Sequence, residues 1–569
     1  MPTLKLEQRM MRLIQARHGV EHDPSRLAEE LPLLGTDIDR CDDEMLEIEI
    51  FPDRPDLLSG ETLSHATRPF LYGSTAESSF HVGSSSFSMS VDPELGSIRP
   101  VILGAVVKGV DTGEGRDDKE DFIKSLMDHQ EKLHFALGRG RRRASIGVHD
   151  MSSLKPPFRV VSVSEDFSFI PLQRDSKMSI REILDSHEKG MEYAHLLDGM
   201  DGYPVILDAD DAVLSFPPII NGDHTTVHHG TTDFFIDVTG WDERACHCSL
   251  LLICLQLVAR GGRVDAVEVK TFDGRTIHTP DSNPIVHRTP TSLVSNILGH
   301  GFSDEELNLA MNRMGGAFRG RDTSSGQEEL LLEMPGWRFD ILHPVDLVEE
   351  IAIGHGYENL GEASPNHAST ATPVVDSGYR RRIRQSLQGM GLQQVQSLTL
   401  SNEGDQFTSM RLEPCGEVTS LSNPITTEHT IMRQSILPSL LRLLAANRHN
   451  ELPQRVYESG VCVRQHRNME RFAWLCAENV SSFAECRGMV QALLRDMGHS
   501  GEVDWIPTPS NEGPWLAGRG CSVNISGIEI GRMGEIDPVV GDGFDLRVPL
   551  HAAEFDLEAL MKAIPDPVL

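Results

Sequence analysis

The chain has 569 residues, 39% of them hydrophobic, which is too many for one hydrophobic core and predicts roughly three to five domains. Its nine cysteines have no repeating spacing, and the closest pair, Cys246 and Cys248, suits neither a zinc knuckle nor a thioredoxin-type redox site, so we expect reduced thiols that are buried or have no role. A formal net charge of −33 argues against extensive binding of nucleic acid, because phosphate contacts require Lys and Arg side chains.

The chain begins with MPTLKLEQRM, which is charged and lacks the apolar segment of a secretory signal. The longest apolar run, from Leu250 to Val258, is too short to cross a bilayer. We therefore expect a soluble, cytoplasmic protein that does not enter a membrane.

The first segment has the pattern of a small αβ unit at residues 1 to 75. Alternating Ile48 and Ile50 predict a strand, Pro52 and Pro55 a turn, and the run from Glu61 to Leu71 a helix. Residues 75 to 90 are rich in serine and have no hydrophobic periodicity, so we expect a linker or long loop there.

Strands and helices alternate in the next segment, which predicts one mixed αβ domain at 90 to 275. VILGAVVKGV and ASIGVHD have strand character, and FIKSLMDHQEKLHFAL has helical spacing. GRGRRRASIGVHD lacks the strand–turn–helix context of a phosphate-binding loop, so its arginines are expected in an exposed loop. DSKMSIREIL is only superficially like a Lys-Met-Ser loop, because Ser179 and Glu182 have the spacing of a helix capping box.

Positive charge is concentrated in two arginine clusters despite the acidic composition. They are Arg139, Arg141, Arg142, Arg143 and Arg380, Arg381, Arg382, Arg384. Each could contact a polyanion, or it could be the solvated face of a helix or loop, and the sequence leaves both open.

The segment SFPPIINGDHTTV places Ser215 and Asn221 around an apolar run, and TDFFIDVTG follows it. Small polar side chains at strand ends beside apolar walls are what a small-molecule pocket requires. Any strand–loop–strand segment has the same composition, so the pattern alone is also compatible with ordinary structure.

The remaining chain predicts two further domains. Residues 280 to 360 form a compact winged-helix-like module, with helices near 290 to 298 and 304 to 314, a strand near Leu331 and a helix starting near Asp346. After a linker at 364 to 375, residues 366 to 569 predict a large antiparallel α+β domain with helices from Arg380 and over 437 to 447. The fold class is therefore α+β multidomain.

Four carboxylates stand close together in WRFDILHPVDLVEEIAIGHGYENL, at 337 to 360. In a helix that begins at Asp346, the residues Asp346, Glu349 and Glu350 share one face, and Asp340 can reach it from the preceding segment. Converging carboxylates need a hard divalent cation, and ligation by oxygen alone suits Mg²⁺. The alternative is an ordinary helix start, with Asp346 as N-cap, Glu349 in a capping box and Glu350 near the positive end of the helix dipole.

Seven segments, taken in order, resemble the beta chains of phenylalanyl-tRNA synthetases of the archaeal and eukaryotic type. They are IFPDRPDLLS, EKLH followed by IGVHD, FPPIING with FIDVTG, WRFDILHPVDLVEEIAIGHGYENL, NPITTEHTIMRQSILPSLL, RVYESG and IGRMGEIDP. The resemblance covers essentially the whole chain. The length leaves no room for the additional tRNA-binding and anticodon-binding domains of bacterial-type beta chains.

The resemblance implies roles for the two sets of residues named above. Asp340, Asp346, Glu349 and Glu350 match the acidic residues of the family's magnesium-associated segment. The domain at 90 to 275 looks like an editing domain, which hydrolyses tyrosine wrongly esterified to the phenylalanine tRNA, with Ser215 and Asn221 in its pocket. A pocket that hydrogen-bonds a phenolic hydroxyl spares the phenylalanine ester, because its polar groups would remain unpaired.

The C-terminal domain at 366 to 569 resembles a class II synthetase catalytic fold without its chemistry. The chain has neither a Phe-Arg-x-Glu nor a Gly-x-Gly-x-x-Glu-Arg motif. The resemblance thus implies that ATP, L-phenylalanine and tRNA react on an alpha subunit, in a complex of two alpha and two beta chains. We expect the leucines of the helix at 437 to 447 to form an exposed apolar interface.

Two other functions remain open on the sequence. One is a free-standing editing hydrolase, which would need no large apolar surface on the C-terminal domain. The other is a non-enzymatic tRNA-binding or structural protein, which the net charge of −33 and the lack of a basic recognition helix disfavour.

Overall fold

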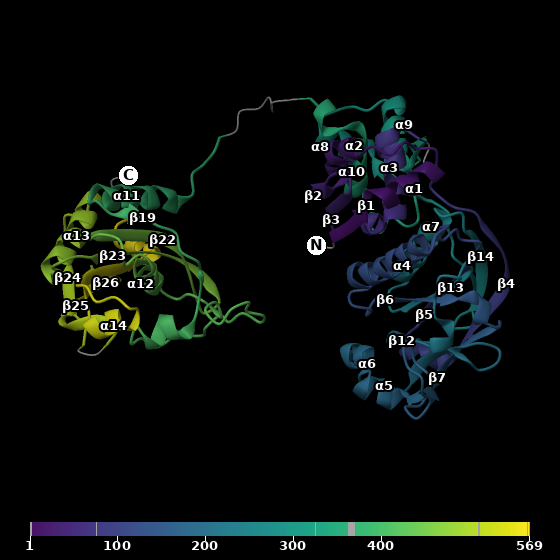
Figure 1. Ribbon diagram of the computed structural model, residues 1–569. Helices are drawn as coiled ribbons and strands as arrows, with labels where there is room; N and C mark the ends of the chain where they lie inside the picture. Colours follow the sequence, from purple (N-terminus) through teal and green to yellow (C-terminus); the bar gives the residue numbers. More distant parts are fainter. Residues whose placement is uncertain are drawn as a thin grey trace. The chain divides into compact units, whose positions relative to one another are not determined.

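The computed structural model of the protein describes residues 3–74, 77–324, 326–361, 370–509, 512–565 and 567. The chain divides into two compact units, residues 1–365 and 366–569, and each contains helices and sheets (Figure 1). The mixed α+β multidomain fold predicted from the sequence is therefore confirmed. In the parts of the chain that the structure describes, no helix is both long and apolar enough to cross a membrane.

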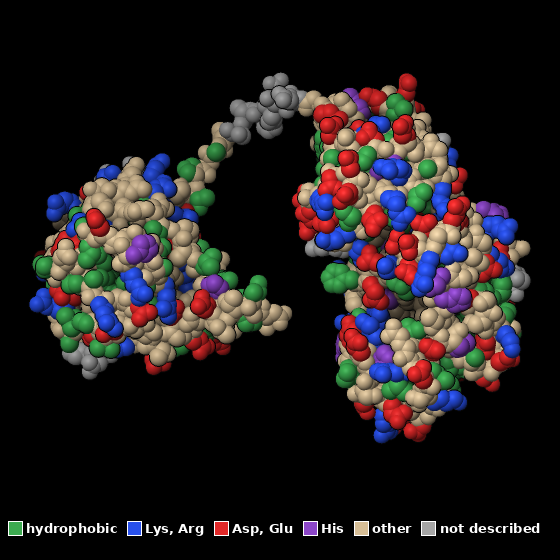
Figure 2. Space-filling view, viewed as in Figure 1, with side chains coloured by type: hydrophobic (Ala, Val, Ile, Leu, Met, Phe, Trp, Pro, Cys, Tyr) green, Lys and Arg blue, Asp and Glu red, His purple; other side chains and the backbone are tan. Residues whose placement is uncertain are grey.

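Acidic side chains are spread over the surfaces of both units, with Lys and Arg side chains among them, on the face shown in Figure 2. The two arginine clusters differ in exposure. Arg380, Arg381 and Arg384 are exposed on one helix, so that cluster forms a solvated helix face. In the other cluster Arg141 is buried, whereas the neighbouring arginines are exposed. The expectation of an exposed loop is therefore wrong for Arg141.

The N-terminal segment contains the strand and helix that its pattern predicts. The strand covers Ile48 and Ile50, and the helix is capped by Ser59, whose hydroxyl accepts the Thr62 amide (3.2 Å). Three antiparallel strands pair in the order β1, β3, β2. The elements are β1 (Thr3–Glu7), α1 (Gln8–Arg17), α2 (Pro24–Glu30), β2 (Thr36–Cys41), β3 (Met45–Ile50) and α3 (Gly60–Tyr72).

A ten-stranded mixed sheet follows, in the order β12-β11-β10-β7-β4-β14-β5-β13-β6 with β15 on β14. The predicted strands over VILGAVVKGV and ASIGVHD and the predicted helix between them are confirmed. The strands are β4 (Val82–Val91), β5 (Val101–Lys108), β6 (Ala144–Asp150), β7 (Phe158–Val163), β10 (Tyr203–Leu207), β11 (Val213–Phe216), β12 (Ile220–Asn221), β13 (Phe234–Gly240), β14 (Arg263–Lys270) and β15 (Thr276–Thr279). The helices are α4 (Arg116–Ala136), α5 (Ile180–Ser186), α6 (Glu188–Tyr193) and α7 (Glu243–Val258), and β8 (Ser168–Phe169) pairs with β9 (Met178–Ser179).

Strand β4 contradicts the linker expected at 75 to 90, of which residues 75 and 76 lie outside the described residues. This strand lies between β7 and β14 and pairs in parallel with both. Its serines hide the hydrophobic periodicity, although Met89 and Val91 are buried. Pairing on both sides fixes the strand here, because strand formation depends more on neighbours than on local propensity.

Residues 285–360 fold as a three-stranded antiparallel sheet, in the order β16, β18, β17, with three helices. The two predicted helices and the strand near Leu331 are confirmed. The helix expected from Asp346 starts two residues earlier, at Pro344, because proline is favoured in a first helical turn. The elements are β16 (Ile285–Pro290), α8 (Thr291–Leu298), α9 (Asp304–Arg313), β17 (Ala317–Asp322), β18 (Glu329–Met334) and α10 (Pro344–His355).

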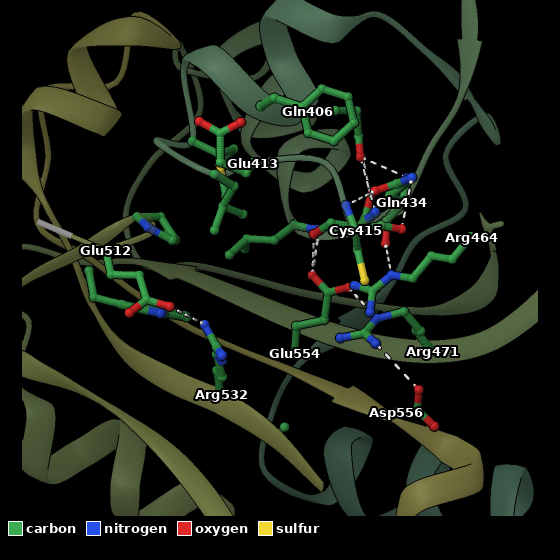
Figure 3. A pocket seen from close by; sticks show the side chains of 18 of the residues that line it. Gln406, Glu413, Cys415, Gln434, Arg464, Arg471, Glu512, Arg532, Glu554 and Asp556 are labelled. Carbon is green, nitrogen blue, oxygen red and sulfur yellow. Dashed lines mark hydrogen bonds and ion pairs between the residues drawn. The ribbon is translucent and has the colours of Figure 1, made fainter. Parts of the chain in front are cut away.

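The second unit is built on a seven-stranded sheet, in the order β19-β22-β23-β27-β26-β25-β24, and only the β19–β22 pair is parallel. Helices α11, α13 and α15 pack on one face and α12 and α14 on the other, where a cavity opens (Figure 3). The strands are β19 (Gln393–Gln394), β22 (Gln454–Arg464), β23 (Arg467–Ala477), β24 (Asp504–Pro507), β25 (Trp515–Ile525), β26 (Ile528–Ile536) and β27 (Leu550–Asp556), besides the pair β20 (Leu400–Ser401) and β21 (Ile431–Met432). The helices are α11 (Val375–Gly389), α12 (Leu437–Ala446), α13 (Phe483–Asp496), α14 (Pro538–Gly543) and α15 (Leu557–Ala563).

Two expectations for this unit need correction. Helix α11 begins at Val375, within the linker expected at 364 to 375, whose residues 364–369 lie outside the described part of the chain. The leucines of α12 do not form an exposed interface, because Leu437, Leu440, Leu441 and Leu444 are buried in the unit's own core and Leu443 is half-buried. Helical periodicity indicates that a face is covered, but it does not identify what covers it.

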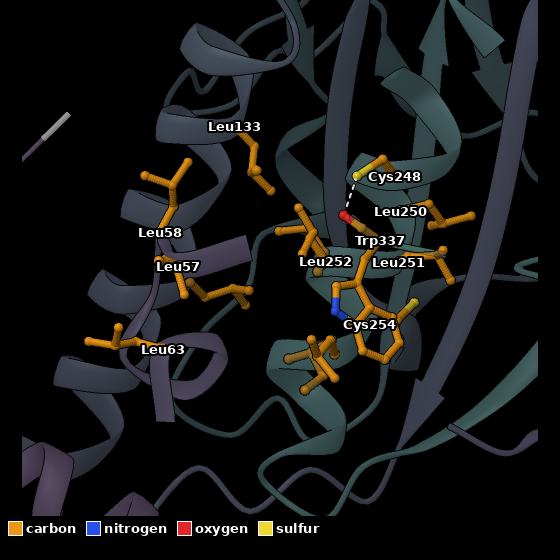
Figure 4. Close-up of a cluster of buried hydrophobic side chains, with 14 of the residues drawn as sticks. Leu57, Leu58, Leu63, Leu133, Cys248, Leu250, Leu251, Leu252, Cys254 and Trp337 are labelled. Carbon is orange, nitrogen blue, oxygen red and sulfur yellow. Dashed lines mark hydrogen bonds between the residues drawn. The ribbon is translucent and has the colours of Figure 1, made fainter. Parts of the chain in front are cut away.

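One hydrophobic core joins the N-terminal segment to helices α4 and α7 and to the segment before α10 (Figure 4). Leu57, Leu58 and Leu63 belong to the same core as the apolar run of α7, which was predicted to be too short for a membrane. Trp337 closes this core and accepts a hydrogen bond from the Cys248 thiol at its carbonyl oxygen (2.9 Å). Parts of the chain far apart in sequence therefore fold together in the first unit.

Candidate functional site

A cavity of about 330 Å³ lies in the first unit beside the hairpin of β11 and β12. Ser215 and Asn221 are directly opposite each other in this hairpin, and both line the cavity. Ser215 is buried, and its hydroxyl has no hydrogen-bond partner among the residues described. Asn221 is half-buried, and its side-chain nitrogen donates only a long bond to the Val148 carbonyl (3.4 Å). A buried hydroxyl without a partner is one that a bound ligand could pair.

Helix α4 supplies one wall of the cavity. Ile123 and Met127 contribute apolar surface, and Gln130 and His134 follow on the same helical face. These two polar side chains hold the backbone of Ile146 from both sides, because Gln130 donates to its carbonyl (2.6 Å) and His134 Nε2 accepts its amide (2.8 Å). Strand β6 ends the sheet order, so the helix satisfies backbone groups that another strand would otherwise pair.

Arg141, the buried member of its cluster, ties the hairpin to α4. Its guanidinium donates to the carbonyls of Pro218 (3.2 Å) and Ile219 (3.0 Å) and to the carboxylate of Glu131 (2.8 Å). The guanidinium also lies over the ring of Tyr193, 4.3 Å from its centre. The arginine therefore shapes the cavity wall instead of offering charge to a polyanion.

Burial sets the protonation of the α4 wall. Burial lowers the pKa of His134, so the imidazole is neutral at pH 7. Because Nε2 accepts the Ile146 amide, the single ring proton is on Nδ1, which faces Glu131 (3.3 Å). Burial alone would raise the pKa of Glu131, but its hydrogen bond to His134 and the nearby cations lower it to about 2. The wall thus presents an ionised carboxylate that already has partners.

The floor of the cavity contains a hydroxyl, an imidazole and a carboxylate in a row. His149 contacts Thr225 Oγ1 through Nδ1 (2.8 Å) and Asp237 Oδ2 through Nε2 (2.7 Å), and all three residues are buried. Gly147 makes room for them, because a Cβ there would lie 2.1 Å from the Asp237 carboxylate. Asp237 accepts only, so His149 donates to it through Nε2, while the Thr225 hydroxyl also donates to the Gly222 carbonyl (3.0 Å).

These floor and wall residues were not predicted as site residues, although the IGVHD and FIDVTG segments that carry His149 and Asp237 had been singled out. The cavity as a whole combines apolar walls with a few fixed polar groups, which is the usual make-up of a small-molecule site. An arrangement of this kind can orient a ligand through its hydroxyl or amino groups.

The four carboxylates of the WRFD segment do not converge on one point. No three of them bring oxygen atoms within 4.8 Å of one another in the part of the chain that the structure describes. Instead the buried guanidinium of Arg338 lies between Asp340 (2.5 Å) and Glu350 (2.6 Å). Arg338 was not assigned a role from the sequence, although it belongs to the same segment.

A second buried ion pair adjoins this one. Arg54 donates to Asp56 (2.8 Å) within the IFPDRPDLLS segment, and the charges of Arg338 and Glu350 act on the pKa of Arg54. The IFPDRPDLLS and WRFD segments, almost 300 positions apart in sequence, therefore share one charged cluster.

The other two carboxylates face outward. Asp346 lies in the first turn of α10 and accepts the amides of Leu342 (2.7 Å) and His343 (2.6 Å), so it caps the helix from inside rather than as its N-cap residue. Partial burial raises the pKa of Glu349, and repulsion from neighbouring carboxylates, Glu350 first, adds to the shift. Asp346 and Glu349 suit Mg²⁺, which proteins commonly bind with one or two carboxylates and several waters.

A larger cavity, of about 880 Å³, lies in the second unit, but its arginines are bonded to other groups of the protein (Figure 3). Glu554 accepts from Arg471 (2.7 Å), from the Ser435 hydroxyl and from the amides of Ile436 and Leu437 at the start of α12. Arg532 contacts Glu529 (2.9 Å). A helix N-terminus and an arginine that could hold a phosphate are thus occupied by a carboxylate of the same chain.

Family models match three segments of this chain. They are described as the B3/4 domain (residues 100–249), the tRNA synthetase B5 domain (residues 288–357) and the phenylalanyl tRNA synthetase beta chain CLM domain (residues 363–557). The first contains the cavity with Ser215 and Asn221, and the second contains the WRFD segment.

The chain is 37% identical to the phenylalanine–tRNA ligase beta subunit of Archaeoglobus fulgidus, over 94% of this chain and 95% of the relative. It is 38% identical to that of Methanosarcina barkeri, over 95% and 96%. A crystal structure of an N-terminal fragment of the phenylalanyl-tRNA synthetase beta subunit from Pyrococcus horikoshii matches with a TM-score of 0.56 and 28% identity, covering 63% of this chain and 100% of the fragment. The chain therefore belongs to the family of phenylalanine–tRNA ligase beta subunits.

Proposed function

We propose that this chain acts as the beta subunit of a phenylalanine–tRNA ligase and that aminoacylation takes place on an alpha subunit. The observation that carries the proposal is the end-to-end match to curated beta subunits, which covers at least 94% of this chain and 95% of the relatives at 37–38% identity. The complex would contain two alpha and two beta chains and would join L-phenylalanine to its tRNA with ATP in the cytoplasm.

The second unit supports the division of labour between the chains. We interpret its largely antiparallel sheet as a class II synthetase-like domain whose catalytic site has been lost. Class II activation needs free cations to hold the ATP phosphates, and such electrostatic stabilisation is usually the largest catalytic contribution. The arginines around the larger cavity are paired with carboxylates or carbonyls instead, as for Arg471 with Glu554 and Arg464 with the Gln434 carbonyl (3.1 Å).

The experiment is phenylalanine-dependent ATP–pyrophosphate exchange with three samples: this chain alone, the alpha subunit alone and the two purified together. We expect no exchange with this chain alone, exchange with the complex, and equal amounts of the two chains in the complex. Exchange by this chain alone, or no association with the alpha subunit, would contradict the proposal.

For the first unit we propose an editing function, the hydrolysis of tyrosine wrongly esterified to the phenylalanine tRNA. The unpaired hydroxyl of Ser215 and the half-exposed amide of Asn221 are available to bond the phenolic hydroxyl of tyrosine. A phenylalanine side chain would leave them unpaired at a cost of about 1–3 kcal/mol. The correct product would therefore bind less well than the mischarged one.

We further propose that residues 280 to 360 form a winged-helix-like module with a Mg²⁺ ion at the WRFD segment. All four predicted carboxylates take part, but in two roles. Asp346 and Glu349 would hold the ion together with water, and Asp340 and Glu350, paired with Arg338, would fix the segment. The ion would join the loop before α10 to the helix and offset the local excess of negative charge.

A further inference from the structure

Three potential metal ligands meet on the buried face of the seven-stranded sheet, opposite the face with the larger cavity. Cys476 on β23 and His551 on β27 are directly opposite each other in antiparallel strands, and Glu478 lies two residues beyond Cys476 on the same face. One ligand atom from each side chain lies within 4.8 Å of the other two. The sheet register alone thus brings a thiol, an imidazole and a carboxylate together.

His551 has no visible partner for either ring nitrogen. The side chain is fully buried, and neither Nδ1 nor Nε2 is hydrogen-bonded to any of the residues that the structure describes. A buried polar group left unpaired costs about 1–3 kcal/mol, and interiors rarely leave one without a reason. Burial also lowers the pKa of His551, so the ring is neutral at pH 7, which is the form that binds metals.

The surroundings of the three ligands carry excess negative charge. Glu478 and Glu485 share one cation, Arg455 (2.6 and 3.2 Å), and Glu535, the partner of His551 on β26, contacts Arg519 (3.1 Å). Three carboxylates thus face two guanidinium groups. A divalent cation bound together with the Cys476 thiolate would remove this imbalance and supply the partner that His551 lacks.

We propose that Cys476, Glu478 and His551 bind one zinc ion that fastens β23 to β27. Thiolate, imidazole and carboxylate are the three usual protein ligands of Zn²⁺. With metal bonds of about 2.3 Å to sulfur and 2.0–2.1 Å to nitrogen, tetrahedral geometry requires a sulfur–nitrogen distance of roughly 3.6 Å, which falls within the 4.8 Å that separates these ligand atoms at most. A water molecule or Glu485 completes the tetrahedron.

Binding replaces the S–H bond of Cys476 with an S–Zn bond, and the proton leaves to solvent. Zinc affinity should therefore increase as pH rises. This behaviour follows because the metal competes with a proton for the same sulfur.

A second group, His300, Glu306 and His355, has similar spacing but a different environment. His300 Nε2 already contacts Glu306 (3.3 Å), both side chains are about one-third exposed, and Glu306 also caps α9 through Ser303. Two of these three groups therefore have partners without a metal, so the inference rests on the cysteine-containing set alone.

The test is to produce the full chain in medium containing Co²⁺, so that metal is present while the sheet forms, and to record its absorption and metal content. Cobalt in this site should give one ion per chain and a thiolate-to-cobalt charge-transfer band. Cys476→Ser should abolish that band and weaken zinc binding, measured by chelator competition, by at least about 100-fold, since a ligand is lost and removing a residue that only hydrogen-bonds a ligand already costs about 10–100-fold. His551→Asn should have the same effect on metal content.

The matched control is Cys462→Ser, because Cys462 is also fully buried in the same sheet, yet it lies outside the cluster. This variant should keep the band, as should His300→Ala. Circular dichroism checks that each variant is folded. Absence of the band from the wild-type chain, or its presence in folded Cys476→Ser, would overturn the zinc site.

Discussion

Two cavities of this protein, one in each unit, differ in what their polar groups are bonded to. In the first unit, the cavity beside β11 and β12 keeps a buried hydroxyl, that of Ser215, without a partner among the described residues. In the second unit, the larger cavity has more charge, but its arginines are bonded to carboxylates or carbonyls of the protein. Cavity size is therefore a poor guide to function here. Unpaired polar groups indicate where a ligand is expected, and internal pairing indicates where a site has been closed.

The largest effect that would test this comparison comes from breaking the pairing in the second unit. Glu554→Ala removes a buried carboxylate, leaves Ser435 and two backbone amides without an acceptor, and leaves Arg471 with only the longer contact to Asp556 (3.5 Å). We expect a loss of about 3–5 kcal/mol in the free energy of unfolding, measured by urea denaturation of the full chain.

Glu512→Ala is the control for this change. Glu512 lines the same cavity, but its side chain is half-exposed and its ion pair with Arg532 is long (3.4 Å). Its effect should stay within about 0.5 kcal/mol. If the Glu554 variant were as stable as the Glu512 variant, the charges of this cavity would not be structural and the comparison would fail.

A pH experiment tests the hydrogen bonds that hold the α4 wall of the cavity in the first unit. The pKa of His134 is lowered in the folded state, so its contribution to stability is complete above about pH 6.5, the unfolded value, and is lost as the pH falls below it. Protonation would break the bond from the Ile146 amide, which should cost about 1–3 kcal/mol. Urea unfolding between pH 7.5 and pH 5 measures this loss.

The variant His134→Gln should flatten that pH dependence, whereas His229→Gln, at an exposed position, should leave it unchanged. An identical slope in all three proteins would show that the α4 wall does not depend on a neutral imidazole.

If Ser215 and Asn221 bind the substrate, their replacement should change the rate of deacylation but not the free energy of unfolding. Asn221→Ala should slow deacylation of tyrosyl-tRNA by the complex by about 10- to 100-fold, because one hydrogen bond to the substrate is lost, and should leave phenylalanine charging unchanged. Ser215→Ala should also impair discrimination while leaving the unfolding free energy unchanged, since the Ser215 hydroxyl has no described partner to lose. Equal hydrolysis of tyrosyl and phenylalanyl esters by the wild-type complex would refute the editing function.

The smallest predicted effect concerns Asp346→Asn. The weaker acceptor at the start of α10 should cost about 0.5–1 kcal/mol, and the rise in melting temperature on adding Mg²⁺ should disappear. Glu305→Gln, an exposed change in the first turn of α9, should keep the Mg²⁺ response. If Mg²⁺ does not change the melting temperature of the wild-type chain, Asp346 and Glu349 are better explained as part of an ordinary helix start.

Sequence patterns predicted elements well where a single face is buried. Helices α3 and α9 and strands β5 and β6 have clear periodicity and were found within a few residues of their predicted bounds. Strand β4 was missed because its stability comes from β7 and β14, which are distant in sequence. The leucines of α12 were assigned to an interface between chains because periodicity does not distinguish an internal partner from an external one.

The candidate sites follow the same rule. Ser215 and Asn221 could be placed together because they belong to one hairpin. Arg141 could not, since its role depends on carbonyls almost 80 positions away. In the WRFD segment, spacing identified the carboxylates, but charge alone could not show that Arg338 lies between two of them.

The core shared by Leu57, helix α7 and Trp337 has a consequence for how this chain can be divided (Figure 4). A fragment that begins after residue 75 would lose the leucines that cover α7 and leave an apolar surface that invites aggregation. The N-terminal segment alone therefore cannot be replaced by the corresponding segment of a relative without changing the contacts of this core. A recombination or truncation that respects the fold has to keep residues 1–365 whole, and boundaries drawn from the separate family models would cut through a single hydrophobic core.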